Sequence, residues 1–178
     1  MIICEIRLIR IRLPLITPYR LSYRTVEAFE PLIVEVRDAA GHSGWGEGHV
    51  SPGSSAETPA GAWAYCRRIA AAAGQDSAVI KATVLESRAL SPVAASAFAS
   101  AIDMLGADPL LRPPARETRL ALLSPVNATT PEAIEAEIDA KLADGFRTFK
   151  VKVGKSLDDD IARLRVIQAA VAGRATMR

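Results

Sequence analysis

The chain has 178 residues and a mass of 19.0 kDa, which suits one domain, or one small domain with part of another. Hydrophobic residues make up 49% and charged residues 24%, so we expect a packed core. A net charge of +2 and an aromatic content of 5% argue against a nucleic-acid partner. No apolar run is long enough for a membrane span, and charges among residues 1–13 are incompatible with a signal peptide, so we expect a cytoplasmic protein with no membrane partner.

Residues 2–13 alternate apolar and charged side chains, which predicts a long, half-buried strand. The alternation slips at Leu8 and Ile9, and this slip predicts a β-bulge. Pro14 and Pro18 are expected to end the strand.

Residues 17–30 form a polar segment, predicted as a loop. Two further strands are expected at 32–37 and 42–47, joined by a turn at 38–41. The first third of the chain is therefore predicted to be a three-stranded antiparallel meander.

An alanine-rich segment follows, from residue 56 to residue 106, and three helices fit it. We predict them at 56–73, 77–88 and 92–105. Pro92 suits a first helical position with Ser91 as the cap, and Gly106 suits the residue that follows a helix.

A proline-rich linker at 109–114 follows this segment, and beyond it the sequence pattern changes to alternating strands and helices. A short strand is predicted at 119–123, and further strands are predicted to start near residues 147 and 174, with capped helices after Thr130 and Ser156 between them. This repeat is typical of βα units and predicts a parallel sheet. Because a closed (β/α)8 barrel needs ~250 residues, the remainder can hold only about two units, as a fragment of something longer or as a small open sheet. We therefore predict an α+β domain over 1–115 and the beginning of an α/β (β/α)8-type barrel over 116–178.

The most informative strand is predicted at 147–153. Alternation places Lys150 and Lys152 on one face and Phe149 and Val151 on the other. Two partly desolvated ammonium groups lower each other's pKa, and a neutral lysine can remove a proton from carbon. The alternative is a strand with two solvated lysines on its open face.

Four stretches together resemble the N-terminal portion of an enolase-superfamily enzyme, of the muconate-lactonizing or mandelate-racemase type. Residues 15–22 resemble the mobile specificity loop of that family, and residues 44–47, Gly-Trp-Gly-Glu, resemble its second loop. Residues 97–109 resemble the helix that leads from the capping domain to the barrel, and residues 149–154 resemble the Lys-x-Lys strand. Their order and spacing agree with the family across nearly the whole chain.

The resemblance implies removal of the proton alpha to a carboxylate, with a divalent metal, usually Mg²⁺, stabilising the enediolate. Lys152 matches the general base or acid and Lys150 matches its neighbour. Substrate contacts are expected from the two loops, at Tyr19, Arg20, Ser22, Tyr23 and His49. The metal ligands of the family lie on later strands, so no metal ligand is assigned in this chain. A small carboxylate substrate and a homo-oligomeric full-length form are expected.

The parent activity is expected to be that of a cycloisomerase, a racemase or epimerase, or a dehydratase, and the 178 residues alone are predicted to be inactive. A non-catalytic remnant that acts as a binding or oligomerisation module is the alternative. Two other patterns are assigned no site. Asp158, Asp159 and Asp160 are interpreted as helix-start acids, and Gly44-x-Gly46-x-Gly48 lacks the context of a dinucleotide site.

Overall fold

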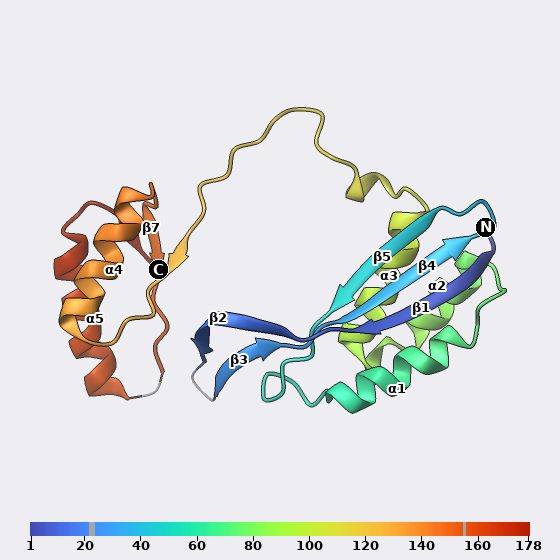
Figure 1. The fold of residues 1–178 in the computed structure, drawn as a ribbon, viewed down its shortest axis with the longest axis horizontal. Helices are drawn as coiled ribbons and strands as arrows, with labels where there is room; N and C mark the ends of the chain where they lie inside the picture. The colour runs from blue at the N-terminus through green and yellow to red at the C-terminus, as the bar shows by residue number, and fades with distance from the viewer. Residues whose placement is uncertain (22–23, 155) are drawn as a thin grey trace. The chain divides into compact units, whose positions relative to one another are not determined.

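A computed structural model describes residues 1–21, 24–154 and 156–178 (Figure 1). The contacts within the chain define two compact units. The first contains Met1–Pro18 and Glu27–Pro113, and the second contains Tyr19–Val26 and Pro114–Arg178.

The first unit contains a three-stranded antiparallel sheet of β1 (Ile3–Arg10), β4 (Leu32–Asp38) and β5 (Ser43–Gly48), in the order β1-β4-β5. The predicted meander is confirmed in these three strands. The bulge predicted at Leu8 and Ile9 is wrong, because Leu8 pairs with Val34 and Ile9 with Ile33 in unbroken register. The register shifts between Ile3 and Glu5 instead. Leu8 and Ile9 therefore point to opposite faces of the sheet, and an apolar side chain occupies each face.

A second, two-stranded sheet lies where the sequence predicted a loop. It pairs β2 (Leu13–Arg20) with β3 (Thr25–Phe29). Pro14 and Pro18 lie inside β2, so the prediction that they end a strand is wrong at these positions. Proline is tolerated on an edge strand because the missing N–H leaves no gap in an interior ladder, and each strand of a two-stranded sheet is an edge.

Three helices follow, as predicted: α1 (Pro59–Ala70), α2 (Ser77–Glu86) and α3 (Pro92–Leu105). Pro92 occupies the first turn of α3, but Ser91 does not cap it with its side chain. The Ser91 hydroxyl donates to the Glu57 carboxylate, which also accepts from the Val93 N–H at 3.2 Å. Gly106 has an ordinary φ of −74°, and the left-handed residue is Ala107 at 53°. The short 3-10 helices η1 (Arg88–Leu90) and η2 (Pro109–Leu111) complete this unit.

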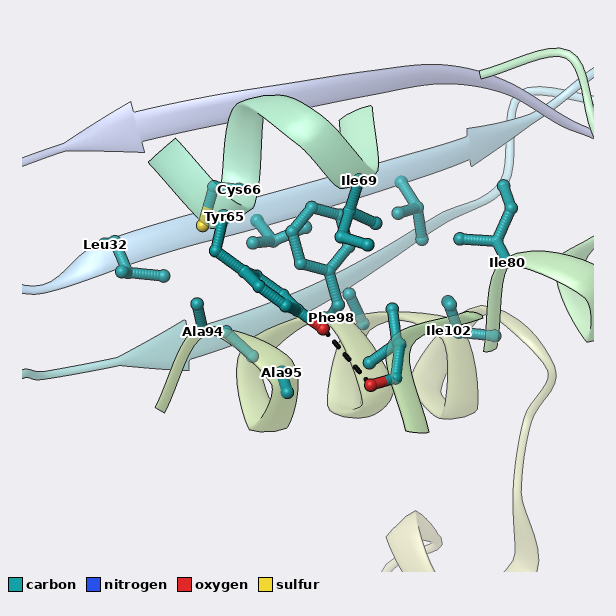
Figure 2. Close-up of a cluster of buried hydrophobic side chains, with 14 of the residues drawn as sticks. Leu32, Tyr65, Cys66, Ile69, Ile80, Ala94, Ala95, Phe98 and Ile102 are labelled. Atoms are coloured by element: carbon teal, nitrogen blue, oxygen red, sulfur yellow. Dashed lines mark hydrogen bonds between the residues drawn. The ribbon is translucent and has the colours of Figure 1, made fainter. Parts of the chain in front are cut away.

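The core of the first unit lies between one face of the β1-β4-β5 sheet and the helices. Figure 2 shows Tyr65 and Ile69 of α1, Phe98 of α3 and Ile80 of α2 directed into the same space. Phe98 and Ile80 are fully buried. The Tyr65 hydroxyl donates to the Val84 carbonyl at 3.1 Å, so the polar end of this ring is satisfied inside the core.

Three alternate glycines on β5 explain how closely α3 approaches the sheet. A Cβ added to Gly46 would lie 1.8 Å from the Ala97 carbonyl oxygen, and one added to Gly44 would lie 2.0 Å from the Ala101 carbonyl oxygen. A Cβ at Gly48 would lie 2.8 Å from the Val93 carbonyl oxygen. The Gly-x-Gly-x-Gly pattern is thus a packing stripe, on which the helix backbone rests directly on the strand.

The second unit repeats strand and helix. Its elements are β6 (Ser124–Pro125), α4 (Pro131–Ala143), β7 (Thr148–Lys150), α5 (Leu157–Val171) and β8 (Thr176–Met177) (Figure 1). The three strands pair in the order β6-β7-β8, both pairs parallel, as predicted. The strand predicted at 119–123 is wrong: Leu120 and Leu122 are 77% and 70% exposed, and pairing begins at Ser124.

Both predicted caps in the second unit are present. The Thr130 hydroxyl accepts from Ala133 N–H at 3.4 Å, and the Ser156 hydroxyl accepts from Asp159 N–H at 3.5 Å. Helices α4 and α5 pack together and bury their apolar sides on Phe149 of β7. In the described part of the chain, no helix has both the length and the apolar character needed to cross a bilayer.

Candidate functional site

The candidate site begins at the carboxyl end of β7, the middle strand of the parallel sheet. Phe149 pairs with Ser124 of β6 on one side and with Met177 of β8 on the other. Lys152 follows the last β7 residue by two positions. Parallel strands gather their carboxyl ends at one edge of the sheet, and α/β proteins place their chemistry at that edge. The predicted parallel setting of the lysine pair is therefore present.

The Lys152 side chain has a specific partner. Its ammonium donates to the hydroxyl of Tyr19, near the end of β2, and lies 3.7 Å from the centroid of the Tyr19 ring. Both residues are half-buried and belong to the second unit. The sequence named each of them separately as a site residue, and the structure brings them together.

A cavity of about 510 Å³ adjoins this pair within the second unit. It opens between the start of α4, the start of α5 and the segment that follows β7. Its polar lining includes Lys152, Asn127, Thr129, Ser156, Asp160 and Arg163, and its apolar lining includes Leu21, Val126, Ile134 and Val166. A pocket with apolar walls and a few charged groups is the usual form of a small-molecule site.

Arg163, in the middle of α5, holds the backbone around Lys152. Its guanidinium donates to the carbonyl oxygens of Val126 at 2.7 Å, Ala128 at 3.0 Å and Lys152 at 3.3 Å. One rigid cation therefore ties the ends of two strands to one helix. Sequence reasoning missed Arg163. The only available signal was an arginine on the half-buried side of an amphipathic helix.

Two carboxylates fix the neighbouring loops. Asp160 accepts a hydrogen bond from Gly154 N–H at 2.7 Å, and Gly154 has φ of +112°, which glycine adopts without strain. Glu137 accepts from the N–H groups of Asn127 at 2.9 Å and Ala128 at 2.8 Å, and from the Lys141 ammonium. Burial acts to raise the pKa of Glu137, but these hydrogen bonds together outweigh it and lower the pKa below the usual value.

Lys150, which was predicted to lie beside Lys152, differs from it in exposure. Its side chain is exposed, and the β7 ladder ends at this residue. Phe149 is fully buried and Val151 packs on the same cluster, as predicted, but Val153 is 54% exposed. The strict alternation predicted through residue 153 therefore fails after Val151, because the chain is no longer held as a strand there.

The other residues predicted to contact substrate do not gather around Lys152 in the described part of the chain. Ser22 and Tyr23, and the side chain of Arg20, lie outside the described residues. His49 belongs to the first unit, where its ring meets the edge of Phe29 with centroids 4.9 Å apart. Both His49 ring nitrogens are buried, and neither has a hydrogen-bond partner in the described part of the chain.

A divalent cation would need a group of oxygen or nitrogen ligands. Among residues 1–21, 24–154 and 156–178, no three His, Cys, Asp or Glu side chains are grouped to hold one. Asp159 and Asp160 lie in the first turn of α5, where they complement the helix dipole, as the sequence indicated. The described residues therefore do not fit a magnesium site, and no chemical step is assigned to a metal on them.

Comparison with known proteins shows which enzymes share this sequence and fold. No family model matches the chain. The L-Lys-D/L-Arg epimerase of Methylococcus capsulatus is 33% identical over 93% of this chain and 49% of its own length. A dipeptide epimerase structure from the same organism, complexed with Mg and the dipeptide L-Arg-D-Lys, has 30% identity and a TM-score of 0.81, covering 100% of this chain and 53% of that one.

A muconate lactonizing enzyme from Pseudomonas fluorescens, complexed with muconolactone, has 26% identity and a TM-score of 0.83 over 99% of this chain and 52% of its own. These relatives are epimerases and isomerases, and the likeness over the whole of this chain agrees with an α+β domain followed by the start of a barrel. The chain is thus similar to the N-terminal half of dipeptide epimerases and of mandelate racemase/muconate lactonizing enzymes, which are enolase-superfamily proteins. It spans about half the length of the curated relatives it matches.

Proposed function

We propose that this chain supplies the capping domain and the lysine-bearing strand of an enolase-superfamily enzyme that removes and returns the proton alpha to a carboxylate. The observation that carries the proposal is the Lys152 ammonium, held by Tyr19 at the carboxyl end of a parallel strand and beside a cavity. An amine in this place can take a proton from carbon once it is neutral, and can return it afterwards.

An epimerase or racemase is the favoured reaction type, because both curated relatives are epimerases. A dipeptide is the favoured substrate, because the Methylococcus capsulatus structure holds one. In this proposal Lys152 exchanges the proton and Tyr19 positions the lysine. Arg163 keeps the strand ends in place, and Lys150 adds positive charge near the substrate carboxylate. Mg, which the same relative holds, has no ligand set among the described residues of this chain, so no step is assigned to it here.

The decisive experiment joins this chain to the remainder of the Methylococcus capsulatus epimerase. We expect the chimera to exchange the alpha proton of a dipeptide with solvent deuterium in the presence of magnesium, followed by NMR. Lys152→Met should slow exchange by at least ~10²-fold, the usual contribution of a general base. Lys81→Met, in the first unit, is the matched control and should leave exchange unchanged. Equal exchange by the Lys152→Met chimera and its parent would refute the assignment.

The inactivity of the isolated 178 residues stays a prediction, tested by the same NMR assay without the added half. Calorimetry with magnesium separates an incomplete enzyme from a non-catalytic module. Tight, stoichiometric magnesium binding by the isolated chain would exclude the binding-module alternative, and appreciable alpha-proton exchange would refute inactivity.

A further inference from the structure

Tyr19 and Lys152 contact each other in two ways, although 133 positions separate them in the sequence. The ammonium donates to the phenol oxygen, and it also lies 3.7 Å from the ring centroid. Together the two contacts fix both the distance and the direction of the ammonium. A half-buried setting strengthens both, because less water competes for the ammonium.

Lys150 provides a comparison two residues away. Its side chain is exposed, and within the described residues its ammonium has no hydrogen bond or ion pair. A free lysine side chain samples many rotamers around its flexible four-carbon stem. Both lysines lie near one strand end, and Tyr19 supplies the hydrogen bond and the ring contact of Lys152.

We infer that Tyr19 is a positioning residue for Lys152. A phenol can accept a hydrogen bond from an ammonium and donate one to a neutral amine. The contact can therefore persist while the lysine gains and loses a proton, whereas the attraction of the ring acts on the charged form alone. Tyr19, near the end of β2, thereby controls how readily the Lys152 amine reacts. This inference rests on the proposed function for its catalytic meaning, but the contact itself does not.

The test measures the chemical reactivity of each lysine in the isolated chain. Trace acetylation with acetic anhydride, read residue by residue by mass spectrometry, reports how freely each amine reacts. We expect Lys152 to react more slowly than Lys150 in the parent chain. Tyr19→Phe keeps the ring and removes the hydroxyl, so the ratio of Lys152 to Lys150 labelling should rise at least about tenfold, as for loss of one hydrogen bond to a charged group. Tyr19→Leu removes both contacts and should raise it further.

Two controls are built into the same spectra. Lys81 pairs with Asp103 in the first unit, and Lys141 pairs with Glu137 in the second. Their labelling should not change in either Tyr19 variant if the fold is kept. Ile16→Ala is the matched variant on the same strand, since that side chain is fully exposed, and it should leave every ratio unchanged.

The reciprocal measurement does not depend on Tyr19 variants folding. Nitration of Tyr19 with tetranitromethane, which attacks the phenolate, should be slower in Lys152→Met than in Lys150→Met, because the first substitution removes the cation beside the phenol oxygen. Equal nitration in these two variants, or a Lys152 to Lys150 labelling ratio that Tyr19→Phe leaves unchanged, would overturn the inference. Neither assay needs metal or substrate, so a chimera that fails to exchange protons would count against the proposed function and leave this result standing.

Discussion

The first unit packs three helices on an antiparallel sheet with strands of eight, seven and six residues, whereas the second packs two helices on a parallel sheet with strands of two, three and two. In the first unit, α3 is held by direct backbone contact with the β5 glycines. In the second, the loops around Lys152 are held by hydrogen bonds that Arg163 donates to carbonyl oxygens and by those that Glu137 accepts from backbone N–H groups. Rigid apolar packing characterises the unit without the lysine pair, and polar anchoring characterises the unit that carries it.

The largest effect that would test this comparison comes from Phe149 on β7, which is fully buried between α4 and α5. Phe149→Ala should destabilise the second unit by about 3–5 kcal/mol, because it removes transfer free energy and leaves a cavity. Hydrogen exchange followed residue by residue should show faster exchange in α4 and α5 and unchanged exchange in α3. Equal acceleration in α3 would contradict the independence of the two cores.

A smaller effect is expected from the glycine stripe in the first unit. Gly46→Ala should destabilise this unit by about 3 kcal/mol, the upper part of the range for overpacking, because the new Cβ meets the Ala97 carbonyl oxygen of α3. Gly106→Ala is the matched control, since its Cβ would meet nothing closer than 3.4 Å and its φ is −74°. Denaturant unfolding measures both variants. Similar midpoints for the two would show that α3 can shift away from β5.

The smallest expected effect is a pH dependence of the stability of the second unit. The pKa of Glu137 is lowered in the folded chain, so this carboxylate contributes stability above its unfolded pKa, and the contribution is lost as pH falls through the lower, folded pKa. Acid should therefore loosen the loop at Asn127 and Ala128 before the apolar core opens. Glu137→Gln should flatten this part of the pH profile of unfolding. An unchanged slope between about pH 5 and pH 3 would show that Glu137 makes no net contribution.

Much of the fold could be predicted from local signals. Pro92, Thr130 and Ser156 marked helix starts correctly, because capping and proline geometry act within a few residues. The errors arose where pairing between distant segments decides whether a strand forms. The β2-β3 sheet was mistaken for a loop, since proline in a strand is acceptable only when the strand is an edge, and that cannot be read locally. The strand predicted at 119–123 failed because its apolar residues find no partner strand.

The candidate site shows the same division. Lys152 and Tyr19 could each be named from motifs, and the spacing of strands and helices could predict a parallel sheet beneath the lysine. Sequence could not show that the tyrosine holds the lysine, that Lys150 is exposed, or that Arg163 secures three carbonyl oxygens. Helix caps and residue alternation depend on neighbours along the chain, so the sequence by itself determined them. Contacts between side chains more than a hundred positions apart depend on how the chain returns upon itself, and only the tertiary structure decided those.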